Sequence, residues 1–405
     1  MLLLLLLPGL ALAAPRAPFT VVVMPDTQFY ACDCSGGTHE TFQAQTAWIA
    51  EQRAALDVRY VAHLGDCVQN GDAVEAEWTW ADAAMSSLED PVTTGESEGI
   101  PYGIAVGNHD QSPFGDPNGT TTFYNQTFGS DRFEARSYYG GHCGDNNDNH
   151  YSTFQAGGMD FLVIDLEYDE AADATVLAWA LDLLQTHPDH RAIVVGHYLI
   201  DGSGAHSAQG AATYAALAGE PNLFLMLGGH YAGEARRSDE TEVGTVHTLL
   251  ADYQSRSNGG DGWLRGMTFV PDEDRIDVWT WSPTLGEFET DDDSMFSLDY
   301  AMGLPDGGDS GDSGDSGGGD GGGDGGADSG DGGGDGDGGG GSTDSGDGGG
   351  DGGDGGTQGD GGGADPTGAD SGGAASDPAC GCGGGGASAW LLLLLPPLLM
   401  RRRRT

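Results

Sequence analysis

Five short polar motifs between Pro25 and His230 combine Asp, Asn or His with glycine or proline. They are Pro25-Asp26-Thr27-Gln28, His63-Leu64-Gly65-Asp66, Gly107-Asn108-His109-Asp110, Gly196-His197 and Gly228-Gly229-His230. Carboxylate and amide oxygens, together with imidazole nitrogens, are ligands for divalent cations. One carboxylate can also bridge two ions about 3.5–4 Å apart, which then clamp the attacking and leaving oxygens of a phosphate group. The motifs therefore predict a two-metal site, with Asp66 as the candidate bridge.

Each motif lies at the end of an apolar run that has the length of a β-strand. These runs occupy residues 19–24, 59–64, 102–106, 192–195 and 223–227, and a further run covers 161–166. Stretches with the apolar spacing of helices separate them, at residues 41–56, 73–88, 172–185 and 207–217. In open α/β sheets, ligands bind at the carboxyl edge of the strands. We therefore expect the five motifs to meet at such an edge.

The strand-like runs in the last third of the expected domain add a second feature to the expected architecture. After Gly228, strand-like runs at 245–250, 264–270 and 275–281 follow one another without helices between them. Alternating strands and helices followed by strands alone predict an α/β fold, a sandwich of two mixed β-sheets flanked by helices. We expect residues 18–303 to form this one domain.

The order of the motifs resembles the calcineurin-like metallophosphoesterase superfamily. The tetrapeptide Gly107-Asn108-His109-Asp110 is the most specific part of this resemblance. The Pro-Asp-Thr-Gln opening and the later run Leu250-Ala251-Asp252-Tyr253-Gln254 resemble an exported bacterial branch of that superfamily. The resemblance implies a metallophosphoesterase-like sandwich and six metal ligands: Asp26, Gln28, Asp66, Asn108, His197 and His230.

The resemblance also implies a reaction. Asp26 would bind the first ion, Asp66 would bridge, and the second ion would be held by the Asn and His ligands. Water activated by two divalent ions (Mn, Fe, Zn or Mg) would attack a phosphomonoester or phosphodiester. His109 would protonate the leaving oxygen and would be oriented by Asp110. The expected protein is an extracellular phosphoric ester hydrolase.

Two departures from the superfamily's pattern affect the first ion. Many members have histidine where this chain has Gln28 and Ala232. Gln28 still offers an amide oxygen, whereas Ala232 offers no ligand. The first ion is thus expected to be weakly bound, to be a harder cation such as Mn²⁺ or Mg²⁺, or to be absent. The alternative function is a non-catalytic surface binding or adhesion module on a decayed scaffold of this kind.

Several polar residues allow two interpretations. Gln28 is either a ligand or a structural amide. Asp252, Tyr253, Gln254 and Arg265 either line a substrate groove, with Arg265 binding phosphate, or join the two sheets as a structural cluster. His142, His150 and the acidic loop 145–148 either hold calcium or form a solvated loop.

Charge and composition exclude some partners. The formal net charge is −49, the chain contains no lysine, and residues 305–378 hold 18 aspartates and no basic residue. Nucleic-acid binding is therefore not expected. Residues 304–378 are mostly Gly, Asp and Ser, and a segment so poor in apolar side chains cannot offset its ordering entropy. We expect a disordered linker there.

Both ends carry patterns typical of export. Residues 1–14 form a leucine run that ends in small residues, which predicts a signal peptide. Residues 379–405 contain Cys380-Gly381-Cys382, a short apolar block and four arginines, and they resemble C-terminal sorting signals of myxobacterial surface proteins. A simple membrane anchor is the alternative. Both interpretations predict secretion with retention at the cell surface or outer membrane, with the cell envelope as partner.

The expected domain contains four cysteines, Cys32, Cys34, Cys67 and Cys143. Export makes disulfides plausible. Cys32 and Cys34 are too close in sequence to bridge each other easily, so we expect one of them to pair with Cys67 or Cys143.

Overall fold

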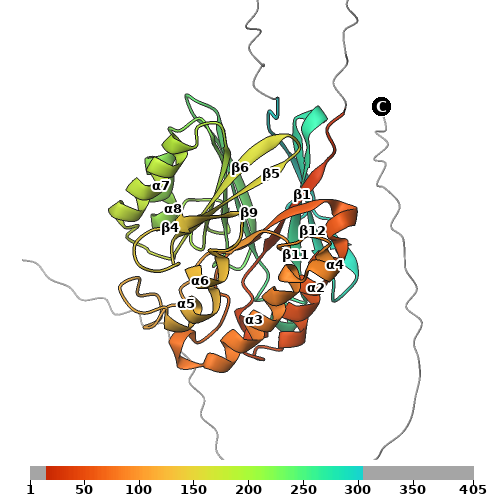
Figure 1. The fold of residues 1–405 in the computed structure, drawn as a ribbon, viewed down its shortest axis with the longest axis vertical. Coiled ribbons are helices and arrows are strands. Elements are labelled where there is room, and N and C mark those ends of the chain that lie inside the picture. Colours follow the sequence, from red (N-terminus) through yellow and green to blue (C-terminus); the bar gives the residue numbers. More distant parts are fainter. Residues whose placement is uncertain (1–14, 304–405) are drawn as a thin grey trace, which may run out of the picture. The chain divides into compact units, whose positions relative to one another are not determined.

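Two seven-stranded β-sheets pack face to face in the computed structural model, which describes residues 15–303 (Figure 1). The predicted signal peptide (1–14), linker (304–378) and C-terminal segment (379–405) lie outside the described residues. The predicted fold class, an α/β sandwich of two mixed sheets flanked by helices, is confirmed.

The first sheet has the strand order β13-β12-β11-β1-β2-β3, and β14 pairs with β12. β1 runs parallel to β2 and antiparallel to β11. Val21 and Val23 of β1 face the core between the sheets. Val22 and Met24 face the helices, so both sides of the strand are buried and its sequence is continuously apolar. The strands are β1 Phe19–Met24, β2 Val58–His63, β3 Tyr102–Ile104, β11 Leu264–Val270, β12 Arg275–Ser282, β13 Glu287–Glu289 and β14 Phe296–Asp299.

The second sheet has the order β4-β5-β6-β7-β8-β10-β9. Its central strands β6, β7, β8 and β10 run parallel to one another, while β5 and β9 pair antiparallel with their neighbours. The carboxyl ends of the parallel strands therefore lie at one edge. The strands are β4 Tyr139–His142, β5 His150–Ala156, β6 Met159–Leu166, β7 Arg191–Gly196, β8 Leu223–Gly228, β9 Gly233–Glu240 and β10 Thr245–Asp252.

Helices cover the outer face of each sheet (Figure 1). α2 and α3 pack on the first sheet, and α7 and α8 pack on the second. These four helices begin and end within two residues of the predicted ones. The helices are α1 Gln28–Ala31, α2 His39–Leu56, α3 Glu75–Glu89, α4 Pro91–Thr94, α5 Thr122–Phe128, α6 Ser130–Phe133, α7 Ala174–Thr186 and α8 Ala208–Leu217, with 3₁₀ turns at Gly71–Ala73, Ser257–Gly259 and Pro271–Glu273.

Some strands escaped prediction because their sequences are polar. β9 reads Gly-Glu-Ala-Arg-Arg-Ser-Asp-Glu, lies at the edge of its sheet and is at least partly exposed along its length. Such a strand carries no apolar alternation, and only its pairing with β10 defines it. Across residues 15–303, no helix combines the length and the apolarity needed to cross a membrane.

Candidate metal centre

The polar motifs converge where the two sheets meet. Asp26, Asp66 and Asn108 follow β1, β2 and β3 of the first sheet, whereas His197 and His230 follow β7 and β8 of the second. Most of these side chains are fully buried, and His230 is partly exposed. The site is therefore built by both sheets together, at the carboxyl ends of parallel strands.

Four ligand atoms surround one point in this site. His197 Nε2 lies 3.0 Å from Asn108 Oδ1 and 3.2 Å from Asp66 Oδ2. His230 Nδ1 lies 2.9 Å from Asn108 Oδ1 and 3.2 Å from His197 Nε2. A divalent ion about 2.1 Å from its ligands separates neighbouring ligand atoms by about 3.0–3.4 Å in octahedral or tetrahedral geometry. These four residues thus fit one shared cation.

A backbone contact orients His197 for this role. Its Nδ1 lies 2.9 Å from the carbonyl oxygen of Leu64, which can only accept a hydrogen bond. Nδ1 therefore carries a proton in this contact, which leaves Nε2 as the ring atom that can bind a cation. Such a second contact fixes the tautomer of a ligating histidine.

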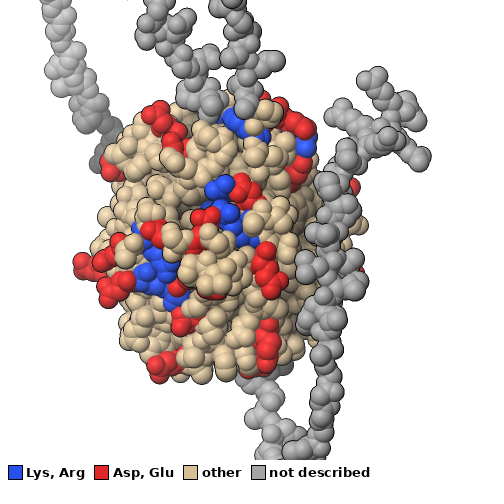
Figure 2. All heavy atoms as spheres, turned by 45° about the vertical axis from the view of Figure 1, so that its right-hand side comes forward, with Lys and Arg blue, Asp and Glu red and all other residues tan. Residues whose placement is uncertain are grey.

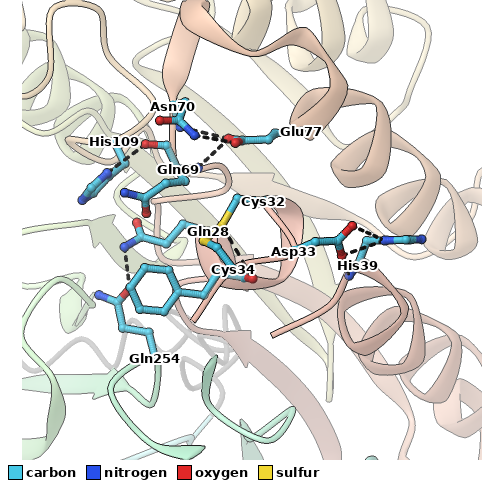
Figure 3. The surroundings of a disulfide bond; sticks show 11 residues. Gln28, Cys32, Asp33, Cys34, His39, Gln69, Asn70, Glu77, His109 and Gln254 are labelled. Atoms are coloured by element: carbon cyan, nitrogen blue, oxygen red, sulfur yellow. Dashed lines mark hydrogen bonds and ion pairs between the residues drawn. A yellow bond between two sulfur atoms is a disulfide. The ribbon is translucent and has the colours of Figure 1, made fainter. Parts of the chain in front are cut away.

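Asp26 and Gln28 lie beside this cluster. The Asp26 carboxylate accepts hydrogen bonds from the His230 backbone N–H at 3.3–3.4 Å and from Gln254 Nε2 at 3.3 Å. Gln28 Nε2 donates to Gln254 Oε1 at 2.5 Å (Figure 3). Gln28 Oε1 is buried and has no hydrogen-bond partner among the described residues. A buried carboxylate and an unpartnered amide oxygen are suitable ligands for a hard cation.

The backbone is strained or tightly packed at several of these positions. Asp66 and His230 adopt positive φ angles of 49° and 71°, a left-handed conformation that costs a non-glycine residue about 1–2 kcal/mol. A Cβ added to Gly107 would lie 2.2 Å from Asp66 Oδ1, and one added to Gly229 would lie 2.3 Å from Asp26 Oδ1. The two glycines therefore let backbone approach both carboxylates closely.

The site concentrates negative charge away from solvent. Burial, followed by the charge of Asp252, raises the pKa of Asp26 well above its usual value. Burial by itself would lower the pKa of His197, but the carboxylates of Asp66 and Asp26 outweigh it and raise that pKa to about 10. Among the described residues, no arginine forms an ion pair with these aspartates. Buried carboxylates that lack an arginine or lysine partner are groups that a bound cation can neutralise.

His109 lies at the side of the cluster. Its backbone N–H donates to Asp66 Oδ1 at 2.8 Å, and its Nδ1 lies 3.0 Å from the carbonyl oxygen of Gln69 (Figure 3). Because a carbonyl oxygen can only accept, Nδ1 carries a proton and the Nε2 edge stays available.

The expectation that Asp110 orients the His109 ring is wrong. Asp110 instead accepts hydrogen bonds from the backbone N–H groups of Gly107 (2.8 Å), Val68 (3.0 Å) and Cys67 (3.2 Å). Its buried carboxylate therefore ties the loop after β2 to the loop after β3. The carbonyl oxygen of Gln69 orients His109.

Of the four residues that allowed a groove or a structural interpretation, Tyr253 and Arg265 fit the structural one. Arg265 is buried and pairs with Glu234, and the Tyr253 hydroxyl donates to the same carboxylate at 2.9 Å. These two side chains join the sheets and do not line the site. The Asp252 carboxylate instead accepts a hydrogen bond from Gln254 Nε2 at 3.1 Å, and the same Nε2 also donates to Asp26 at 3.3 Å. Asp252 ends the parallel strand β10, so the rule that located the five motifs also applies to it.

Aromatic side chains that the motifs did not indicate pack around His230 and His109. The ring centroids of Tyr168, Tyr198 and Tyr231 lie 5.6, 5.0 and 5.0 Å from that of His230. Phe114 lies 4.5 Å from the His109 ring and is 64% exposed. We call these four side chains the aromatic rim.

The disulfide prediction was wrong. Cys67 and Cys143 are free thiols. Cys32 bonds to Cys34 (Figure 3). Asp33 between them has φ 51°, and this turn brings their Cα atoms to 5.2 Å, within the usual disulfide range. The bridge directly follows α1, the helix that begins with Gln28.

The loop at 145–148 has a structural explanation. The Asp148 carboxylate accepts hydrogen bonds from Thr121, Asn125 and Asn146 at 2.6–2.8 Å. Neutral donors already satisfy this carboxylate, which argues against the calcium site. The expected solvated loop is also not what forms, because Asn147 and Asp148 are buried.

Comparisons with known proteins agree with this arrangement. A family model described as calcineurin-like phosphoesterase matches residues 19–234. An uncharacterized Bacillus subtilis protein, YvnB, is 33% identical over 297 residues, which cover 69% of this chain and 22% of that protein. The chain thus spans about a fifth of this relative.

Two solved structures are also similar. A purple acid phosphatase, PPD1, from yellow lupin (Lupinus luteus) seeds is 13% identical with a TM-score of 0.49, over 71% of this chain and 54% of that one. A dimetal phosphatase from Danio rerio is 12% identical with a TM-score of 0.47, over 71% of this chain and 100% of that one.

Proposed function

Because this chain belongs to the calcineurin-like phosphoesterase family, we propose that its candidate metal centre hydrolyses a phosphomonoester or a phosphodiester. The general class, a metal-dependent phosphoester hydrolase, follows from the family. One observation carries the assignment to this centre: two imidazole nitrogens and an amide oxygen lie 2.9–3.2 Å from one another, and a carboxylate oxygen lies 3.2 Å from one of the imidazoles.

The proposed ligands divide into two groups that share one carboxylate. Asp66 would bridge, Asp26 and Gln28 would hold the first ion, and Asn108, His197 and His230 would hold the second. When bound, two divalent ions would polarise the phosphoryl oxygens and lower the pKa of an attacking water.

His109 is the proposed general acid. Its Nδ1–H is held by the carbonyl oxygen of Gln69, so a second proton on Nε2 is the one it can transfer. Water oxygen forms the new bond to phosphorus, the ester P–O bond breaks, and the departing alcohol takes the proton from His109. The neighbouring Phe114 ring limits how far the imidazole can turn.

We also propose that the enzyme acts outside the cell and is retained at the cell surface. The sequence patterns at 1–14 and 379–405 support this location. The Cys32–Cys34 disulfide is a second support, because disulfides persist in oxidising compartments. Nucleic acid is not a proposed substrate, since acidic side chains are scattered over the face shown in Figure 2 and the basic ones there lie beside acidic ones.

The test uses the purified protein with added Mn²⁺, Zn²⁺ or Mg²⁺ and two chromogenic substrates, p-nitrophenyl phosphate and bis(p-nitrophenyl) phosphate. We expect hydrolysis of at least one of them, and we expect Asp66→Asn and His230→Ala to lose both hydrolysis and bound metal. Asp189→Asn, an exposed aspartate before β7 at the opposite strand ends, is the matched control. Full activity in either site variant would contradict the assignment.

A further inference from the structure

We propose that Asp252 is a ligand of the first metal position and replaces the imidazole that Ala232 lacks, which makes that position an all-oxygen site for a hard divalent cation. This inference rests on the proposed two-metal function and adds a residue and a cation class to it. Three observations support it: the sheet register, the contacts of Gln254 and the free oxygen of Gln28.

The register of the second sheet brings Asp252 to the right edge. β10 lies between β8, which leads into His230, and β9. In the antiparallel pairing of β10 with β9, Asp252 stands opposite Gly233, the residue that follows Ala232. Asp252 is fully buried. A carboxylate therefore lies on the strand beside the position that offers no ligand.

The Gln254 side chain shows where the carboxylates of Asp26 and Asp252 point. Gln254 Nε2 lies 3.3 Å from Asp26 Oδ2 and 3.1 Å from Asp252 Oδ2. Two buried carboxylate oxygens thus converge on one amide nitrogen, which carries only a partial positive charge. Neither carboxylate pairs with an arginine within residues 15–303. A cation between the same oxygens would neutralise them far better than an amide does.

Gln28 completes the oxygen set. Its amide nitrogen is used by Gln254, but its Oε1 is buried without a hydrogen-bond partner among the described residues. A buried unsatisfied amide oxygen costs about 1–3 kcal/mol, and coordination to a cation would remove that penalty. Amide and carboxylate oxygens are the ligands that Mg²⁺, Mn²⁺ and Ca²⁺ prefer.

The two halves of the centre therefore differ in chemistry. The first would use oxygens of Asp26, Gln28, Asp252 and the shared Asp66. The second would use two imidazoles and one amide oxygen beside the same shared carboxylate, a set that suits Zn²⁺ or iron. We infer a mixed centre, with a hard cation in the first position and a softer one in the second.

The experiment measures metal content and ligand type rather than activity alone. Metal-free protein is loaded with one equivalent of Zn²⁺ and then titrated with Mn²⁺, with bound metal followed by elemental analysis and electron paramagnetic resonance. We expect the native protein to hold one ion of each kind. Asp252→Asn should weaken Mn²⁺ binding about 10- to 100-fold and keep the Zn²⁺. The control Asp189→Asn should bind both as the native protein does.

Two further measurements extend this test, and the first uses only the native protein, so it does not depend on whether Asp252→Asn folds. In the native protein, electron spin-echo modulation of the bound Mn²⁺ should show no directly coordinated imidazole nitrogen, and a strong nitrogen signal would overturn the inference. Ala232→His combined with Asp252→Asn should restore first-site binding and shift its preference toward Zn²⁺.

The outcomes separate this inference from the proposed function. Unchanged Mn²⁺ affinity in Asp252→Asn would exclude Asp252 as a ligand and leave the hydrolase proposal intact. Hydrolysis of the ester by native protein that holds only one bound ion would likewise contradict a functional ion at the first metal position. Native protein that binds no cation and hydrolyses no ester would overturn the proposed function itself.

Discussion

His230 Nδ1 lies 2.9 Å from Asn108 Oδ1, although 122 positions separate the two residues in the chain. Asn108 follows β3 of the first sheet and His230 follows β8 of the second. Their contact therefore depends on how the two sheets pack together. A change that shifts one sheet relative to the other should disturb metal binding before it unfolds the protein.

Gly229→Ala should impair the first metal position. The added Cβ would lie 2.3 Å from Asp26 Oδ1, so the carboxylate or the loop must shift. We expect first-ion affinity to fall at least about tenfold, measured by Mn²⁺ titration. Gly219→Ala is the matched control, because a Cβ there meets nothing within 4 Å. Equal affinities in the two variants would show that the loop yields without consequence.

His109→Asn should slow hydrolysis without releasing metal. Loss of a general acid typically costs about 10²- to 10⁴-fold in rate. The loss should be greatest for alkyl esters, whose alcohols leave poorly without a proton, and smallest for nitrophenyl esters. Steady-state kinetics on both ester types, with metal content as the second readout, checks this. A uniform loss across leaving groups would assign His109 a positioning role.

Asp110→Asn should act differently from His109→Asn. The Asp110 carboxylate accepts three backbone hydrogen bonds between two loops and does not contact the His109 ring. We expect lower thermal stability and no dependence of the remaining rate on the leaving group. A leaving-group dependence like that of His109→Asn would restore Asp110 as the orienting residue.

Removal of bound cations should destabilise the fold. Asp26, Asp66 and Asp252 are buried and form no ion pair with arginine in residues 15–303, so a cation that binds only the folded state stabilises it. At a free metal concentration of 100 times Kd the contribution is about 2.7 kcal/mol per site. Calorimetry with and without chelator should show a lower Tm after chelation. An unchanged Tm would argue against occupied sites.

Asp165→Asn should change how stability depends on pH. Both carboxylate oxygens of Asp165 are buried without hydrogen-bond partners among the described residues, and burial raises its pKa well above the usual value. The folded state therefore holds this proton more tightly than the unfolded state. The resulting stability is complete below about pH 4 and is lost as pH rises through the raised folded-state pKa.

The Asp165→Asn variant removes the part of the pH dependence of stability that comes from this carboxyl group. Urea unfolding from pH 4 to pH 8, with saturating cations, should show Asp165→Asn gaining stability relative to the native protein as pH rises. The gain can reach about 1.4 kcal/mol per pH unit. Asp189→Asn, an exposed control, should follow the native curve. Parallel curves for all three proteins would mean that Asp165 titrates normally.

Phe114→Ala should alter substrate preference. Phe114 is 64% exposed at the aromatic rim, where it can stack on an aryl or planar group next to the phosphate. An aromatic contact contributes about 0.5–1.5 kcal/mol, which is about 2- to 12-fold in kcat/KM. We expect kcat/KM to fall for aryl esters and to stay constant for alkyl esters. Val92→Ala, an exposed apolar residue in α4, is the control.

The sequence determined the apolar strands, the four long helices and most of the proposed ligands, because these depend on local patterns. Apolar runs of strand length that end in Asp, Asn or His predicted that Asp26, Asp66, Asn108, His197 and His230 would gather at one edge. The helices α2, α3, α7 and α8 were likewise predictable from apolar spacing. The position and end of an apolar strand are properties of a short segment, so they can be predicted without knowledge of the rest of the chain.

Only the tertiary structure decided the contacts that join distant segments. The pairing of Asp252 with Gly233, the hydrogen bonds of Asp110 to the β2 loop and the Cys32–Cys34 bridge all depend on register or on a turn at positive φ. The polar strand β9 carries no periodic signal of its own. These features arise from packing between elements, where the favourable free energy belongs to a pair of segments and leaves no pattern in either one alone.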